Sequence, residues 1–147
     1  MNEMKPGKDY IGVGGGVLIF NDSNEVLLMK RGTKAKNEAG WWSKPGGSVE
    51  YGEKASEMAK REIKEELNID IEITGLLPHT DHIIENEGQH WLAINFIGKV
   101  VGGELKNMEP HKCEEVRWFK LNEIPEMIVQ NTAEGIENYR NGKYIKL

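Results

Sequence analysis

Apolar and β-branched residues gather in five stretches of strand-like length, and turn-forming residues separate these stretches. The predicted strands cover residues 10–20, 26–30, 69–77, 91–101 and 116–121. Two further segments are predicted to be helices, over residues 53–67 and 125–139, with Pro125 in the first turn of the second. Strands before, between and after one central helix predict an α/β domain built on a mixed sheet.

The length of 147 residues suits one domain, and we expect residues 10–147 to form it after a flexible segment, residues 1–9. The net charge of −5 argues against broad nucleic-acid binding, because no excess of basic side chains exists to neutralise phosphates. The single cysteine, Cys113, excludes an internal disulfide framework and fits a reducing compartment. No apolar run approaches the roughly 18 residues of a membrane span, and no signal segment is recognisable. We therefore expect a cytoplasmic protein.

The predicted helix over residues 53–67 carries carboxylates on its apolar side. At about 100° per residue, one arc of this helix collects its apolar side chains, which are Ala55, Met58, Ala59, Ile63 and Leu67. Glu62 and Glu66 fall in the middle of that arc, and Glu65 falls at its margin. Like charges four residues apart repel, and burial of an unpaired carboxylate costs several kcal/mol. A positive group is therefore expected against this face.

Two kinds of positive group meet this requirement, namely basic side chains from elsewhere in the chain or a divalent metal ion. Closely spaced carboxylates without an associated His or Cys favour a hard, oxygen-seeking ion such as Mg²⁺ or Mn²⁺. The helix is preceded by Pro45-Gly46-Gly47, whose two glycines lack Cβ atoms and let the backbone approach a ligand closely. A phosphate-bearing substrate suits this loop and the positive end of the helix dipole.

A second glycine run, residues 14–16, lies inside the first predicted strand. It is not a dinucleotide-binding fingerprint, because Val17 occupies the place where the third glycine of that fingerprint would stand. A twisted or bulged strand and a close approach to a ligand both explain the run.

Residues 47–69 resemble the Nudix box. The specified positions that match the box in register are Gly47, Glu53, Arg61, Glu62, Ile63, Glu65, Glu66 and Ile69. Asn68 stands where the family has Gly, and Asn is the best replacement if this position needs a left-handed conformation after the helix. The strands before the box and the segment 106–114 resemble MutT-like nucleoside triphosphate diphosphatases. The resemblance implies a Nudix-type α/β/α sandwich, with a mixed, curved sheet between helices.

The resemblance also implies hydrolysis of a nucleoside diphosphate linked to another moiety. Among such substrates it favours a nucleoside triphosphate, cleaved to the monophosphate and pyrophosphate with Mg²⁺ as cofactor and Mn²⁺ as a substitute. The implied catalytic residues are Glu62, Glu65 and Glu66, and the implied metal ligands are the same three side chains and the carbonyl of Gly46. The implied substrate contacts are Arg31, Gly46 and Gly47, and the implied structural ion pair joins Glu53 and Arg61.

Alternative functions stay open at this point. One alternative is hydrolysis of ADP-ribose, a nucleotide sugar or a dinucleotide polyphosphate. Related ADP-ribose and dinucleotide polyphosphate hydrolases often carry Pro or Tyr where this chain has Ile83 and Ile84, which weighs mildly against both. Another alternative is a non-catalytic nucleotide-sensing domain, although such domains commonly lose the box glutamates that this chain keeps. The expected partner is a small-molecule nucleotide rather than nucleic acid or a membrane, and the family suggests a homodimer.

Three polar residues outside the box are weaker candidates. Lys44 departs from the apolar residue that often precedes Pro-Gly-Gly in the family, and both a substrate contact and surface exposure are open for it. Asn131 and Thr132 lie in the second predicted helix, where a contact with the base of a nucleotide is conceivable.

Overall fold

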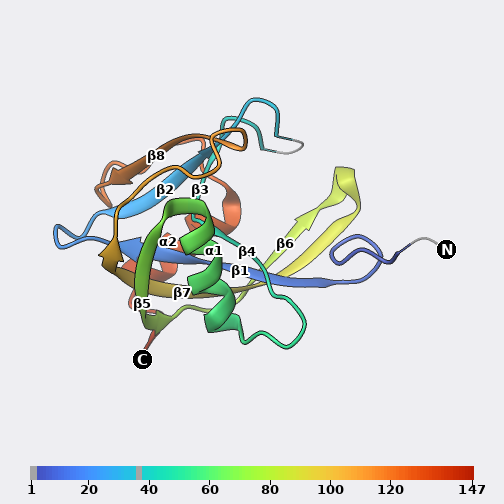
Figure 1. The fold of residues 1–147 in the computed structure, drawn as a ribbon, viewed down its shortest axis with the longest axis horizontal. Coiled ribbons are helices and arrows are strands. Elements are labelled where there is room, and N and C mark those ends of the chain that lie inside the picture. The colour runs from blue at the N-terminus through green and yellow to red at the C-terminus, as the bar shows by residue number, and fades with distance from the viewer. Residues whose placement is uncertain (1–2, 36–37) are drawn as a thin grey trace.

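A computed structural model describes residues 3–35 and 38–147 of the chain. Within these residues one mixed sheet of nine strands lies between two α-helices, with α1 in front of the sheet and α2 behind it in Figure 1. The elements are β1 Gly12–Phe20, β2 Val26–Arg31, β3 Trp42–Ser43, β4 Gly46–Ser48, α1 Ala55–Leu67, β5 Ile69–Leu76, β6 Thr80–Ile84, the short 3₁₀ helix η1 Glu85–Glu87, β7 Gln89–Gly103, β8 Cys113–Phe119, α2 Gln130–Arg140 and β9 Ile145–Lys146. The predicted sandwich of helix, mixed sheet and helix is confirmed.

β1 is the central strand of the sheet. The strand order is β3-β2-β1-β7-β5-β9, while β4 also pairs with β1, β6 with β7, and β8 with β2. The β1–β7 pair is parallel, and the other pairs are antiparallel. Strand β1 therefore carries β4, the loop strand before α1, on one edge and the long strand β7 on the other.

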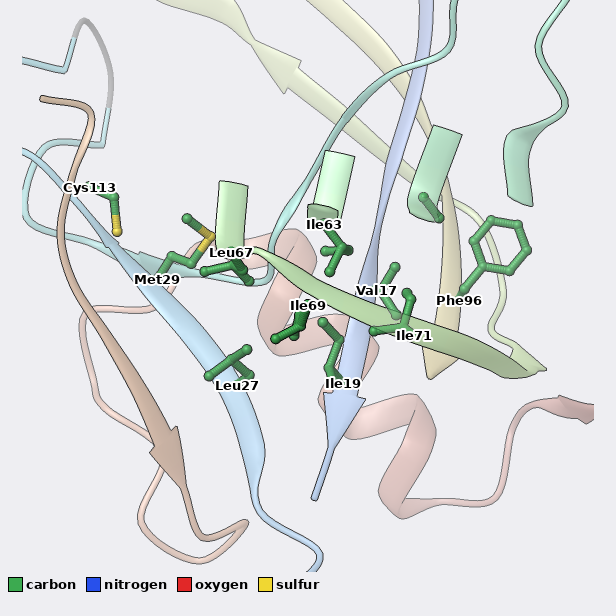
Figure 2. Close-up of a cluster of buried hydrophobic side chains, with 11 residues drawn as sticks. Val17, Ile19, Leu27, Met29, Ile63, Leu67, Ile69, Ile71, Phe96 and Cys113 are labelled. Atoms are coloured by element: carbon green, nitrogen blue, oxygen red, sulfur yellow. The ribbon is translucent and has the colours of Figure 1, made fainter. Parts of the chain in front are cut away.

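Alternate residues of β1 face two different cores. Val17 and Ile19 join the cluster that packs under α1, which Figure 2 shows with Ile63 and Leu67 of that helix. Leu18 and Phe20 join the second cluster, whose members include Ile136 of α2. Because successive side chains of a strand point to opposite faces, one apolar run supplies both cores, and each helix has an apolar layer to cover.

The helix α1 buries the apolar arc that its sequence predicts. Met58, Ala59, Ile63 and Leu67 are buried, and the Glu57 carboxylate accepts a hydrogen bond from the backbone N–H at the N-cap position. The helix ends at Asn68, whose φ of 60° and ψ of 24° are left-handed. The left-handed conformation proposed for this position is therefore present.

The start of the second helix was predicted wrongly. Residues 125–139 were expected to be helical from Pro125 onward, but α2 begins at Gln130. The preceding segment is extended because it pairs with β3: the Trp42 N–H donates to the Met127 carbonyl, and the Val129 N–H donates to the Trp42 carbonyl, both at 2.8 Å. This pairing joins segments far apart in the chain, so local helix signals do not reveal it.

The two glycine-rich segments lie side by side. Gly15 pairs with Gly47, and Gly16 pairs with Gly46, in the antiparallel β1–β4 ladder. A Cβ on Gly46 would lie 2.0 Å from the Gly15 carbonyl oxygen, and a Cβ on Gly15 would lie 1.8 Å from the Ile94 carbonyl oxygen. Only glycine permits this close backbone approach, which seats the loop before α1 against the central strand.

The beginning of the chain is partly hydrogen-bonded. The Gly7 N–H donates to the Tyr10 carbonyl, and the Gly7 carbonyl accepts from the His90 N–H, each at 2.7 Å. Met1 and Asn2 lie outside the described residues, and the flexibility expected for residues 1–9 stays a prediction.

Candidate active site

The acidic side of α1 places Glu62 and Glu66 toward the interior and Glu65 toward solvent. The Glu62 side chain is 18% exposed, whereas the Glu65 side chain is 57% exposed. The Oε1 atom of Glu66 is buried and has no hydrogen-bond partner within the described part of the chain. The inward orientation that the helical arc predicts for Glu62 and Glu66 is therefore present in the structure.

The neighbouring residues do not supply enough positive charge to balance the buried Glu66 carboxylate. Burial is the main cause that raises its pKa to about 8, and the negative charges of Glu62 and Glu109 raise it further. A backbone hydrogen bond from Gly46 and the charge of Lys112 oppose this rise without cancelling it. Binding of a cation to a buried carboxyl with a raised pKa is favourable, because the cation stabilises the ionised form.

Arg61 holds the loop before the helix against the helix itself. Its Nε lies 2.6 Å from Oε2 of Glu53, and its Nη2 lies 3.0 Å from Oε1 of the same carboxylate. The Nη2 also donates to the Ser48 carbonyl at 3.1 Å. The hydrogen bonds from Arg61 lower the pKa of Glu53. This bidentate contact is the ion pair that the Nudix resemblance implies, and its geometry is structural.

The same arginine also contacts the acidic face of the helix. Arg61 Nη1 lies 2.9 Å from Oε1 of Glu62 and 3.3 Å from Oε2 of Glu65. Burial nevertheless raises the pKa of Glu62 above its ordinary value, against the opposing effect of Arg61. The Arg61 guanidinium therefore partly neutralises the Glu62 carboxylate. The Oε1 atom of Glu66 has no such partner among the described residues.

A cleft of about 700 Å³ opens in front of Glu66. Its lining includes all three predicted substrate contacts, Arg31, Gly46 and Gly47, together with Glu66. Glu62 and Glu65 lie outside this lining. The glycine run of β1 also reaches the cleft, through Gly14 and Gly15.

Glu109 is a site residue that the sequence analysis did not single out. It lines the cleft, and its carboxylate lies 3.4 Å from the Lys112 ammonium. The loop that carries it is held on α1, because the Met108 N–H donates to the Glu66 carbonyl at 2.9 Å. A single Glu in a loop belongs to no periodic pattern. The sequence therefore pointed to this region only through the resemblance of residues 106–114 to MutT-like enzymes.

The start of α2 also lines the cleft. Asn131 and Thr132 line it, and the Oγ1 atom of the buried Thr132 accepts a hydrogen bond of 3.0 Å from the Lys44 N–H. Lys44 lines the cleft as well, and its side chain is partly buried. Of the two options left open for Lys44, the structure favours a position facing the ligand cleft.

The carboxylates fit a hard divalent cation. In the described part of the chain no group of three or more His, Cys, Asp or Glu side chains is arranged to hold a metal ion. Mg²⁺ does not need such a group, since it keeps several waters and takes one or two carboxylates plus substrate phosphates. The buried, unpartnered oxygen of Glu66 and the partly buried carboxylate of Glu62 supply oxygen ligands of this kind.

Comparison with known proteins identifies the family of the chain. The family model for the NUDIX domain matches residues 11–139, so the chain belongs to the Nudix hydrolase family. Members of this family are enzymes that act on nucleotide-like substrates and generally need a divalent metal ion. Within the family the chain is MutT-like: it is 37% identical to a MutT Nudix hydrolase from Burkholderia pseudomallei, with a TM-score of 0.79 and coverage of 86% of this chain and 95% of that one.

Two curated relatives extend the comparison. The chain is 37% identical over 109 residues to an ADP-ribose pyrophosphatase from Methanocaldococcus jannaschii. The aligned region covers 74% of this chain and 62% of the relative's length. It is 28% identical over 126 residues to a putative 8-oxo-dGTP diphosphatase from Bacillus subtilis. This aligned region covers 86% of this chain and 78% of that relative. None of the described helices has the length and apolar character needed to cross a bilayer.

Proposed function

We propose that the chain hydrolyses a nucleoside triphosphate to the monophosphate and pyrophosphate, with Mg²⁺ as the metal and Mn²⁺ as a substitute. One observation carries the proposal: a buried carboxylate oxygen of Glu66 without a partner among the described residues borders a cleft of about 700 Å³. The cleft has the size of a small-molecule site, and its depth beside carboxylates suits a substrate that brings phosphates and a cation together.

The metal would be held by Glu62 and Glu66, with Glu65 and the Gly46 carbonyl completing the set of ligands. When bound, a divalent ion neutralises phosphate oxygens and lowers the pKa of water. One of the three glutamates, or an acid outside the box, accepts a proton from the attacking water while the water oxygen bonds to phosphorus and the bond to the leaving pyrophosphate breaks.

The phosphates of the substrate are assigned to the end of the cleft beside Glu66. Arg31 lines the cleft at the end of β2 and is assigned a phosphate contact. The backbone of Gly46 and Gly47, which have no Cβ atoms, is assigned to approach the same phosphates closely. Lys112, on the loop that borders Glu66, adds positive charge at this end.

ADP-ribose is a second candidate substrate. The Methanocaldococcus jannaschii relative named an ADP-ribose pyrophosphatase, at 37% identity, favours it. The Bacillus subtilis relative named a putative 8-oxo-dGTP diphosphatase instead favours a triphosphate, and a damaged base is one variant of that substrate. ADP-ribose yields two monophosphates on hydrolysis, whereas the proposed reaction yields pyrophosphate.

The experiment is a panel of nucleoside triphosphates, 8-oxo-dGTP and ADP-ribose with Mg²⁺, in which pyrophosphate, orthophosphate and the nucleoside monophosphate are measured separately. Pyrophosphate from a triphosphate supports the proposal, and turnover of ADP-ribose alone contradicts it. The Glu66→Gln variant should lose Mg²⁺-dependent hydrolysis while its circular dichroism spectrum stays that of the wild type. Full activity in this variant would remove the metal assignment, and tight nucleotide binding without turnover in the wild type would favour the sensing alternative.

A homodimer, a cytoplasmic location and the absence of nucleic-acid binding are further proposals. Sedimentation of the purified chain tests the first, imaging of a tagged chain in cells tests the second, and titration with labelled DNA and RNA tests the third.

A further inference from the structure

We propose that Lys44 is a specificity-determining residue, whose ammonium donates a hydrogen bond to a ring carbonyl of the substrate's base. It would select bases with an exocyclic carbonyl, such as guanine, hypoxanthine or uracil, over bases with an amino group at the same place. The inference rests on the proposed function, which assigns the phosphates to the end of the cleft beside Glu66.

The position of Lys44 is set on two sides. Its backbone N–H is bonded to Oγ1 of Thr132 at the start of α2. Its side chain lies over Gly16, where a Cβ on the glycine would come within 3.0 Å of the Lys44 Cε and 3.1 Å of its Cγ. The apolar stem of the lysine thus occupies the space left by a missing side chain, and little freedom remains for it.

Lys44 lies on the side of the sheet away from the acidic helix. Val17 faces the core under α1, whereas Leu18 faces the core that includes Ile136 of α2. Because side chains alternate along a strand, the open face of Gly16, and Lys44 with it, belongs to the α2 side. The charged groups are divided in the same way.

Different charged residues act most strongly on Glu66 and on Lys44. The charges that act on the Glu66 carboxyl include those of Glu62, Glu109 and Lys112. The charge that acts on the Lys44 ammonium is that of Glu134, an exposed residue of α2. We therefore assign the α2 side of the cleft, where Lys44 lies, to the base, and the side of Glu66 to the phosphates.

The Lys44 ammonium has no ion-pair partner among residues 3–35 and 38–147. A partly buried cation without a partner is costly to the free protein, and a ligand acceptor would offset that cost. The cleft lining on the α2 side includes the neutral residues Val129, Asn131 and Thr132, which suits a flat, uncharged ring.

The chemistry of the ammonium determines which bases it accepts. An ammonium has three N–H donors and no acceptor. The O6 and N7 atoms of a guanine-type base accept from it, whereas the 6-amino group of adenine is itself a donor and would face another donor. From contacts of this kind we expect a preference of roughly tenfold or more.

The experiment compares kcat/KM for two substrate pairs that differ mainly in one exocyclic group, ITP against ATP and UTP against CTP. The wild type should prefer the carbonyl member of at least one pair by about tenfold or more. In Lys44→Met, which keeps a side chain of similar length without the charge, that ratio should fall to near one. Lys60→Met, a change to an exposed lysine of α1, is the matched control and should keep the wild-type ratios.

Equal rates within both pairs for the wild type, or a preference that survives in Lys44→Met, would overturn the inference. The wild-type ratios test it even if Lys44→Met does not fold, and Lys44→Leu is the second variant in that case. Hydrolysis of none of the four triphosphates would contradict the proposed function itself, which distinguishes that failure from the failure of the role of Lys44.

Discussion

The Glu62 carboxylate occupies the space where a side chain on Gly47 would begin. A Cβ at position 47 would lie 2.3 Å from the Glu62 Cδ and 2.6 Å from both of its oxygens. The two residues are in contact although they belong to different elements, β4 and α1. The glycine of the loop and the acid of the helix are therefore matched in shape.

A Gly47→Ala substitution should consequently impair activity more than folding. The atoms that must move are the far end of a flexible side chain, so we expect less than about 1 kcal/mol of lost stability. The displaced carboxylate should cost roughly a hundredfold in kcat/KM, because small misplacements near reacting groups are expensive. Chemical denaturation and steady-state kinetics with the accepted triphosphate measure the two effects.

Gly135→Ala is the control for that change. A Cβ on Gly135 would meet only Leu18 and Leu77 at ordinary distances of 3.9 and 4.0 Å. Alanine is the better helix former by about 0.5–1 kcal/mol, so this variant should be more stable and fully active. Comparable losses of activity in both alanine variants would contradict the special role of position 47.

The metal-free protein should lose stability as the pH rises from about 5 to 8. The folded-state pKa of Glu66 is raised from its ordinary value of 4.5 to about 8, by burial first and then by Glu62 and Glu109, while Lys112 opposes the rise. The folded state therefore binds a proton that the unfolded state has released in this window. The free energy of unfolding then falls with pH, by at most about 1.4 kcal/mol per pH unit.

Urea denaturation in EDTA across this pH range measures the slope. Glu66→Gln should flatten it, because an amide does not titrate. Added Mg²⁺ should restore the stability of the wild type above pH 7, and Lys60→Met should behave as the wild type. An unchanged slope in Glu66→Gln would show that other groups cause the dependence.

Arg61→Lys should lower both the melting temperature and kcat/KM. A lysine keeps the charge, but its single ammonium cannot hold both oxygens of Glu53 and the Ser48 carbonyl as the guanidinium does. The loop that carries Gly47 would then be less well placed, at a cost of roughly tenfold or more in kcat/KM. Thermal unfolding followed by circular dichroism, together with kinetics, provides the check; wild-type values for both would refute a role in holding the loop.

Asn68→Ala should destabilise the end of α1 by about 1 kcal/mol. The residue has a φ of 60°, which costs a residue with a Cβ roughly 1–2 kcal/mol unless it is Asn or Asp, and the substitution also removes the Asn68 Nδ2 bond to the Glu104 carbonyl. Asn68→Gly should be close to neutral, since glycine favours this conformation but loses the same bond. Chemical denaturation of both variants tests the order, and an alanine variant as stable as the glycine variant would contradict it.

The sequence predicted those features that depend on neighbours along the chain. The inward orientation of Glu62 and Glu66 follows from helical periodicity, and the left-handed Asn68 follows from the residues that tolerate such a helix end. The late start of α2 was missed because Trp42 pairs with Met127 and Val129, across more than eighty residues. The short strands β3, β4, β6 and β9 were missed since each is too short or too polar to carry a pattern of its own.

The sequence by itself determined the class of fold, the acidic face of α1 and the family, because period, spacing and residue type are local properties. Only the tertiary structure decided that Gly47 seats the Glu62 carboxylate, that Glu109 borders the same carboxyls, and that Lys44 faces the cleft beside Thr132. These contacts join strands, loops and helices that are distant in the chain. Part of their physical basis is the pairing of β1 with β4 and β7, which brings the glycine-rich backbones together beside the cleft.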